Sequence, residues 1–139
     1  MIAPMEVPPQ PAPDEDTVGF WQATAEGRLE LCRCKQCRQW LQPPLERCPT
    51  CNGETSFEPV AGTGELYSFI VVHKLAVPGY GDQLPYVVAL VELDEQPGLR
   101  LPGRLVGIDI DKVEIGQRVR SEIEGLPGGD FSVALFRPA

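Results

Sequence analysis

All five cysteines of this 139-residue chain lie within one stretch, "CRCKQCRQWLQPPLERCPTC", between positions 32 and 51. Cys34 and Cys37 are separated by two residues, as are Cys48 and Cys51, and ten residues lie between the two pairs. Each pair presents two thiolates from a tight turn, and two such turns placed face to face form a tetrahedral four-sulfur site that suits zinc. This spacing predicts a zinc ribbon, and it constrains the fold more than any other feature of the sequence.

Cys32 is the cysteine left over. It stands two positions before Cys34, so in an extended strand both side chains point to the same side. Its four-residue gap to Cys37 also falls within known ligand spacings, so replacement of Cys34 by Cys32 as a ligand stays open; we favour a free thiol packed beside the site. The residue after each second cysteine should tolerate a positive φ, a position that Asn52 fits well and Arg38 fits poorly.

The predicted ion is structural. Four thiolates close the shell of a metal ion, whereas a catalytic zinc keeps one position open for water or substrate. The segment 28–51 carries five basic and two acidic side chains, which largely offset the negative charge of such a cluster. We therefore expect zinc to fold a segment too small to hold itself together. Iron bound as in rubredoxin uses the same ligands, and the spacing does not distinguish the two metals.

The chain before the cysteines divides into two segments. Residues 1–16 contain five prolines and four acidic residues, which predicts an extended, disordered tail. Residues 17–27 predict a short helix that Asp16 or Thr17 caps and Gly27 ends. Its apolar face, formed by Phe20, Trp21 and Thr24, either packs against the rest of the chain, which we favour, or docks another protein.

The chain after the cysteines changes to a strand pattern. Apolar and alternating runs rich in β-branched residues are separated by turns containing glycine and proline. Five short strands without a strong helix between them predict a mainly β fold with a closed OB-type barrel, and a sandwich is the alternative. The ribbon is assigned to 28–58 and the barrel to 59–139. The expected strands are 64–74, 86–93, 98–109 (bent or bulged around Pro102 and Gly103), 117–125 and 131–136.

Few residues of the barrel segment indicate chemistry. The only histidine of the chain is His73, and nothing in the sequence nominates a partner for it. Asp109 and Asp111 fall on one side of an extended segment, but they precede a turn and are expected to be solvated. The loop 75–85 borders the usual binding face of an OB barrel, so it is either a contact for a ligand or partner or an inert loop. We expect a binding or scaffolding module without catalytic residues of its own.

Composition narrows the classes of partner and location. Twenty acidic residues against twelve basic ones give a net charge of −8, which disfavours a nucleic-acid backbone as ligand. The sequence shows neither the layout of a signal peptide nor an apolar run of the roughly 20 residues that a membrane helix needs. A reducing, cytoplasmic location is expected, where clustered cysteines bind metal and do not form disulfides.

Together these segments resemble a known family. The stretches "FWQATAEGRLELCRCKQC", "PPLERCPTC", "GTGELYSFIVVHK", "PYVVALVEL" and "VEIGQRV" are similar, in the same order, to bacterial and archaeal acyl-CoA-associated proteins. In that family a rubredoxin-like zinc ribbon precedes an OB-fold, and the group was long catalogued as a domain of unknown function. Arg38, where the first knuckle of the family usually has glycine, and the additional Cys32 depart from the pattern.

The resemblance implies a function that the residue pattern alone does not. Members bind thiolase-like or hydratase-like enzymes of acyl-CoA metabolism as hetero-oligomers; the partner supplies the catalytic residues, and acyl-CoA is shared with it. By resemblance, the metal ligands are Cys34, Cys37, Cys48 and Cys51. We expect a non-catalytic accessory subunit of a thiolase-like enzyme, with a steroid side-chain aldolase preferred. A hot-dog-fold enoyl-CoA hydratase is the alternative partner, and a nucleic-acid-binding module ranks below both.

Overall fold

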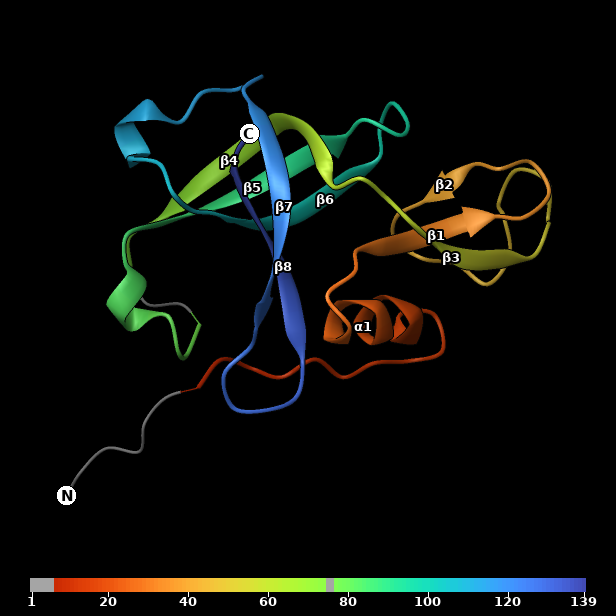
Figure 1. Cartoon of the computed structure of the whole chain (residues 1–139), viewed down its shortest axis with the longest axis horizontal. Coiled ribbons are helices and arrows are strands. Elements are labelled where there is room, and N and C mark those ends of the chain that lie inside the picture. The colour runs from red at the N-terminus through yellow and green to blue at the C-terminus, as the bar shows by residue number, and fades with distance from the viewer. Residues whose placement is uncertain (1–6, 75–76) are drawn as a thin grey trace.

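The structure is a computed structural model that describes residues 7–74 and 77–139. It is made mainly of strands and contains a short helix, a three-stranded sheet that carries the cysteines, and a closed five-stranded barrel (Figure 1). This order of elements confirms the fold predicted from the sequence. In chain order the elements are α1 (Val18–Ala25), β1 (Glu30–Cys34), β2 (Trp40–Leu41), β3 (Thr55–Pro59), β4 (Thr63–Val72), η1 (Gly81–Gln83), β5 (Tyr86–Leu93), β6 (Arg100–Leu105), η2 (Ile110–Lys112), β7 (Arg118–Gly125) and β8 (Ser132–Pro138).

The residues around α1 explain where the helix starts and ends. Oδ1 of Asp14 accepts the backbone N–H groups of Asp16 and Thr17 at 3.0 and 2.9 Å. Thr17 occupies the N-cap position, one of the two residues expected there, but its side chain makes no capping hydrogen bond, and the carboxylate of Asp14 accepts the N–H groups at this end instead. Gly27 follows the last turn with a φ of 79°, a conformation that glycine adopts at low cost, so it ends the helix as predicted.

The apolar face of α1 packs within the chain. Thr24 is only 1% exposed, and Phe20 packs against the core of the barrel. The ring of Trp21 meets the ring of Phe131 edge-on, with 5.8 Å between their centroids. The helix lies beside β1 and β8 (Figure 1), so its apolar residues join the cysteine-bearing sheet to the barrel.

The barrel has the strand order β4-β5-β6-β8-β7 and closes where β7 pairs with β4. All its pairings are antiparallel except that of β6 with β8, which is parallel and has a single register pair, Leu105 with Phe136. A closed sheet excludes the sandwich considered from the sequence. On β5, residues Val87, Ala89, Val91 and Leu93 are buried and the residues between them are half-buried, because one face of a barrel strand points to the interior.

The bulge considered at Pro102 and Gly103 is absent, because β6 pairs with β5 in continuous register through both residues. The register shift lies instead in β4, between Leu66 and Ser68. Glycine at 103 has a different use. A Cβ atom there would lie 3.0 Å from the ring of Phe136, so Gly103 lets β8 approach β6 closely.

The sheet that carries the cysteines and the barrel share one hydrophobic core. Leu31 of β1 and Trp40 of β2 are 0% and 6% exposed and belong to the same buried cluster as the interior of the barrel. Cys32 and Cys34, whose side chains leave β1 on the opposite face, belong to a smaller second cluster. The buried residues of the shared core are Leu29, Leu31, Trp40, Leu66, Val87, Ala89, Val91, Leu93, Leu99, Leu101, Leu105, Val119 and Phe136.

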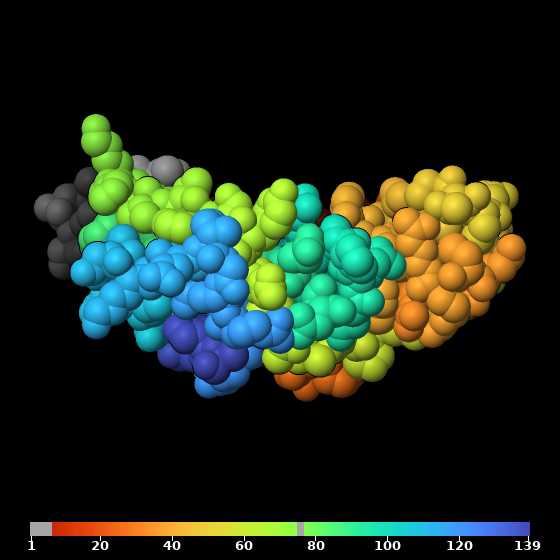
Figure 2. Space-filling view, turned by 90° about the horizontal axis from the view of Figure 1, so that it is seen from above, coloured from red at the N-terminus to blue at the C-terminus, as the bar shows by residue number. Residues whose placement is uncertain are grey.

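A side-chain amide adds a polar link between the two parts. Gln96, in the connection from β5 to β6, accepts the N–H of Trp40 at 2.9 Å through Oε1 and donates from Nε2 to the carbonyl of Trp40 at 3.1 Å. This geometry imitates the backbone pairing of a neighbouring strand. The space-filling view shows the turquoise β5–β6 connection pressed against the orange segment that carries the cysteines (Figure 2).

The segment 1–16 was expected to be a disordered tail; residues 1–6 lie outside the described part of the chain. From residue 7 onward it runs without regular secondary structure along the barrel. Pro8 is buried, and Nε2 of Gln10 donates to the carbonyl of Pro127 at 2.9 Å. Pro8 and Gln10 therefore contact the rest of the chain, whereas most of residues 7–16 are exposed.

Candidate metal centre

The two cysteine pairs form turns with the same backbone hydrogen bonds. In the first knuckle, residues 34–39, the N–H of Arg38 donates to the carbonyl of Cys34 at 3.1 Å. In the second, residues 48–53, the N–H of Asn52 donates to the carbonyl of Cys48 at 2.8 Å. The N–H of each first cysteine returns to a carbonyl five residues on, at 2.8 and 3.0 Å. The chain thus builds two equivalent turns, each of which presents two sulfur atoms.

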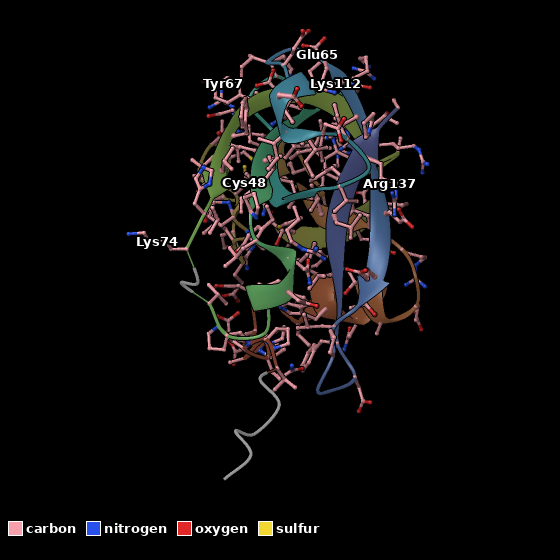
Figure 3. All side chains as sticks on the ribbon, turned by 90° about the vertical axis from the view of Figure 1, so that its left-hand side faces the viewer. Cys48, Glu65, Tyr67, Lys74, Lys112 and Arg137 are labelled. Carbon is pink, nitrogen blue, oxygen red and sulfur yellow. The ribbon has the colours of Figure 1, made fainter. Side chains whose placement is uncertain are left out.

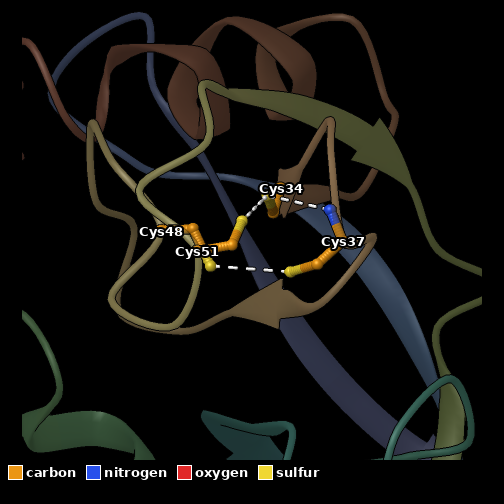
Figure 4. Close-up of side chains that lie close together, drawn as sticks. All are labelled: Cys34, Cys37, Cys48 and Cys51. Atoms are coloured by element: carbon orange, nitrogen blue, oxygen red, sulfur yellow. Dashed lines mark hydrogen bonds between the residues drawn. The ribbon is translucent and has the colours of Figure 1, made fainter.

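The four sulfur atoms of the two knuckles converge (Figure 4). All lie within 4.8 Å of one another, with 3.4 Å between the Sγ atoms of Cys34 and Cys51 and 3.6 Å between those of Cys37 and Cys48. A zinc–sulfur bond of about 2.3 Å in tetrahedral geometry places the sulfurs about 3.8 Å apart, close to these separations. Thiolates at this spacing are a metal-binding arrangement suited to zinc or iron.

Backbone N–H groups point at the first of these sulfurs. The N–H groups of Gln36 and Cys37 donate to Sγ of Cys34 at 3.3 and 3.4 Å. Burial raises the pKa of the Cys34 thiol, but these donors outweigh it and lower the pKa to about 6.

The pKa of the Cys37 thiol shifts in the opposite direction. The backbone of Gln39 lowers its pKa, but desolvation and the neighbouring sulfurs outweigh this and raise the pKa to about 11. Four sulfurs this close do not all ionise without a cation to offset their charge. The electrostatics of the cluster therefore match a bound cation.

Cys32 stays apart from the cluster. Its side chain is 1% exposed, and its Sγ lies 3.5 Å from the carbonyl of Leu45, to which the thiol donates. It is not among the four sulfurs that converge in the described part of the chain. Replacement of Cys34 by Cys32, which the sequence left open, has no support in this geometry.

Arg38 adopts the backbone conformation that it was judged to fit poorly. Its φ is 67°, close to the 60° of Asn52 at the equivalent position of the second knuckle. The guanidinium of Arg38 forms two hydrogen bonds with the carboxylate of Glu58, at 2.8 and 2.7 Å. This pairing lowers the pKa of the Glu58 carboxyl below its usual value. This pair could not be predicted from the sequence, because the two residues lie on different elements and 20 positions apart.

The other residues considered for chemistry are not brought together. His73 lies exposed just after β4, next to Lys74, which points away from the barrel (Figure 3). Asp109 and Asp111 are both exposed, as expected, and Asp109 forms an ion pair with Lys112 at 3.6 Å.

In the loop expected over 75–85, residues 75 and 76 lie outside the described part of the chain. The remainder packs against the barrel, where Tyr80 meets Tyr86 with 5.7 Å between ring centroids. Within residues 7–74 and 77–139, no helix is long and apolar enough to cross a membrane.

Comparison with known proteins agrees with this order of elements. The model of the ChsH2 rubredoxin-like zinc ribbon domain matches residues 21–58, and the model of the ChsH2 C-terminal OB-fold domain matches residues 57–124. A DUF35 domain-containing scaffold protein of Methanocaldococcus jannaschii is 38% identical over 127 residues, which cover 88% of each chain. The chain belongs to the ChsH2 (DUF35) family.

Two further relatives are named as hydratase subunits. The probable enoyl-CoA hydratase alpha subunit of Thermomonospora curvata is 41% identical over 98% of this chain. The 3-oxo-4,17-pregnadiene-20-carboxyl-CoA hydratase alpha subunit of Mycobacterium tuberculosis is 32% identical over 93% of it. This chain spans only 41% and 40% of the lengths of these two relatives.

A solved structure of the ChsH2 family has the same fold. A chain of the Ltp2-ChsH2(DUF35) aldolase superimposes with a TM-score of 0.83 at 38% sequence identity. The alignment covers 93% of the present chain and 98% of that chain. The helix, the ribbon and the barrel are therefore one shared architecture.

Proposed function

We propose that Cys34, Cys37, Cys48 and Cys51 hold a structural zinc ion. The support is the convergence of their four sulfur atoms within 4.8 Å, together with the knuckle turns that present them. Four protein sulfurs fill a tetrahedral shell, so the ion supplies folding energy and offers no position for a substrate.

Metal analysis of two matched cysteine variants tests this assignment. The wild type should contain one zinc per chain, and its cobalt-substituted form should show the visible absorption of a tetrahedral sulfur site. Cys34→Ser should lose both signals, whereas Cys32→Ser, a change to an equally buried cysteine outside the cluster, should keep both. A folded, metal-free wild type, or a metal lost from Cys32→Ser and kept in Cys34→Ser, would refute the assignment.

We propose further that the chain is a non-catalytic accessory subunit of a thiolase-like enzyme acting on acyl-CoA, with a steroid side-chain aldolase as the preferred partner. One observation carries this proposal: the alignment with a chain of the Ltp2-ChsH2(DUF35) aldolase runs over 98% of that chain. The pregnadiene-carboxyl-CoA substrate in the name of the mycobacterial relative points to a steroid acyl-CoA. We include a cytoplasmic location in the proposal, since clustered thiols need a reducing compartment.

The surface of the chain supports a protein partner over a nucleic acid. Nine of the 12 lysine and arginine side chains form ion pairs with acidic side chains within the described residues. A basic groove needs cations that are free to meet phosphate. Neutralised arginines and a net charge of −8 offer a polyphosphate little attraction.

Purification from the native host tests the subunit proposal. A tagged, metal-loaded chain should bring down a thiolase-like enzyme, identified by mass spectrometry, in a complex of defined mass. The reconstituted complex should cleave a β-hydroxyacyl-CoA by a retro-aldol reaction, and the chain alone should not. Recovery of the chain as a lone monomer, or cleavage by the chain without a partner, would contradict the proposal.

A hydratase is the second candidate partner, because the relative from Thermomonospora curvata with 41% identity is named as an enoyl-CoA hydratase subunit. The same purification distinguishes the two. A hydratase-like enzyme in the complex, with hydration of an enoyl-CoA and no retro-aldol cleavage, would favour this candidate over the aldolase.

A further inference from the structure

The two knuckles repeat more than their cysteines. Residues 33–38 read "RCKQCR" and residues 47–52 read "RCPTCN", so an arginine stands immediately before the first cysteine of each pair. Because the knuckles have the same backbone hydrogen bonds, Arg33 and Arg47 occupy equivalent positions in space as well as in sequence.

Both arginines bind the same backbone group of their own knuckle. Nε of Arg33 donates to the carbonyl of Arg38 at 2.7 Å. Nη1 of Arg47 donates to the carbonyl of Asn52 at 3.4 Å. Each carbonyl belongs to the residue after the second cysteine, the one with a positive φ (67° and 60°). The coincidence of sequence, position and acceptor in two separate turns indicates a shared role.

That residue is the strained point of each turn. A non-glycine residue is rarely left-handed, because its Cβ atom crowds the following carbonyl oxygen, and arginine tolerates the conformation less well than asparagine. In the first knuckle, this turn aims the N–H groups of Gln36 and Cys37 at Sγ of Cys34. A hydrogen bond to the carbonyl of the left-handed residue therefore stabilises the arrangement that presents the sulfurs.

We propose that Arg33 and Arg47 are positioning residues of the metal centre. Each stabilises one cysteine knuckle by a hydrogen bond to the carbonyl of the left-handed residue in that knuckle. This inference rests on the proposed metal ligands. It adds two residues that neither touch the ion nor belong to the cysteine motif, and it accounts for a non-glycine residue at the strained position of both turns.

The two arginines should differ in how strongly they stabilise their knuckles. Arg33 is held in place: its guanidinium lies 4.5 Å from the ring centroid of Trp40 and 3.6 Å from the carboxylate of Glu58. Arg47 is exposed, and its hydrogen bond is longer than the usual range. The knuckle that Arg33 stabilises also contains Arg38, which tolerates a positive φ less well than Asn52 does. Loss of Arg33 should therefore weaken the metal centre more than loss of Arg47.

Metal release from the full, zinc-loaded chain tests the proposal. Variants Arg33→Gln and Arg47→Gln are compared with Arg28→Gln, which removes an exposed arginine paired with Glu26 and Glu30 and changes the net charge equally. Transfer of zinc to a colorimetric chelator should accelerate about tenfold in Arg33→Gln, the lower limit for residues that support metal ligands indirectly. It should accelerate less in Arg47→Gln and stay unchanged in Arg28→Gln.

Two further variants test the hydrogen bond itself. Arg33→Met has the same net charge as Arg33→Gln but no hydrogen-bond donor, so it should release zinc at least as fast as Arg33→Gln. Arg38→Gly relieves the strain, so adding Arg33→Gln to it should cause little further acceleration. Release at the wild-type rate from Arg33→Gln, or an equal effect of that change with and without Arg38→Gly, would overturn the proposal.

Amide hydrogen exchange gives a readout that does not depend on the ion. The N–H of Arg38, bonded to the carbonyl of Cys34 at 3.1 Å, should exchange faster in Arg33→Gln than in the wild type, with the second knuckle unaffected. A wild type without metal would refute the ligand assignment, and unchanged exchange at Arg38 would refute the role of Arg33, so the two failures are distinguishable.

Discussion

The shared core predicts that damage to the ribbon destabilises the barrel. Leu31 lies on β1, three residues before Cys34, yet it is 0% exposed and packs with the barrel interior. Leu31→Ala removes three buried carbon atoms, which costs about 2.4 kcal/mol at about 0.8 kcal/mol for each. The cavity left behind raises the cost to about 3 to 4 kcal/mol, because closely packed neighbours collapse only in part.

Urea unfolding of the metal-loaded chain measures this loss. With a denaturant slope of about 2 kcal/mol per molar urea, the midpoint should fall by about 1.5 to 2 M. With Trp21 replaced by phenylalanine in every variant compared, tryptophan fluorescence reports on Trp40 in the ribbon, and far-ultraviolet circular dichroism reports mainly on the strands of the barrel. Both signals should shift together in one transition, because one core serves both parts.

Leu45→Ala is the matched control, because Leu45 lies in the same ribbon and is 42% exposed. Its free energy of unfolding should stay within about 0.5 kcal/mol of the wild-type value, as is usual for surface substitutions. The reasoning is refuted if Leu31→Ala shifts the fluorescence transition and leaves the dichroism transition in place, since the ribbon and the barrel would then unfold as separate units.

Three further outcomes are expected. Chelation of the metal should unfold the sheet of β1, β2 and β3 and also lower the urea midpoint of the barrel signal; an unchanged barrel midpoint would count against the shared core. Gly64→Ala should destabilise the chain in a melting experiment, because its Cβ atom would lie 2.2 Å from the carbonyl oxygen of Glu92, and Gly125→Ala, with open space around it, is the comparison for the added methyl group. Arg118 lowers the pKa of the Asp94 carboxyl below its usual 3.8, so the stability advantage of the wild type over Asp94→Asn should be constant at higher pH and shrink as the pH falls from 3.8 through that lowered pKa; an advantage independent of pH would exclude the ion pair as its source.

The features that could be predicted from the sequence are local ones. Ligand spacing and knuckle turns are set within a few residues, so the cysteine spacing was enough to predict the convergence of four sulfurs. The limits of β5 were also predicted correctly, because an apolar run rich in β-branched residues ends at a turn on each side.

The features that were missed depend on contacts between distant residues. Gln96 and Trp40 are 56 positions apart. Nothing in the sequence of a turn indicates that a side-chain amide will form hydrogen bonds with the backbone of a distant strand. Pro102 and Gly103 suggested a bend or a bulge, because the close approach of β8, which favours glycine at position 103, is not visible in the sequence of β6. Arg33 and Arg47 did leave a local sign, the repeated Arg-Cys-x-x-Cys, which becomes meaningful only once the carbonyl acceptors are located.

The seam between β6 and β8 has a consequence for how the molecule opens. Along every other junction of the barrel, three or more register pairs join neighbouring strands, but here only Leu105 and Phe136 do. Thermal fluctuations should part the wall along this line before any other, exposing the edges of two strands while the remaining sheet stays intact. The aromatic ring of Phe136 is fully buried at that point, so its packing is what holds β6 and β8 together.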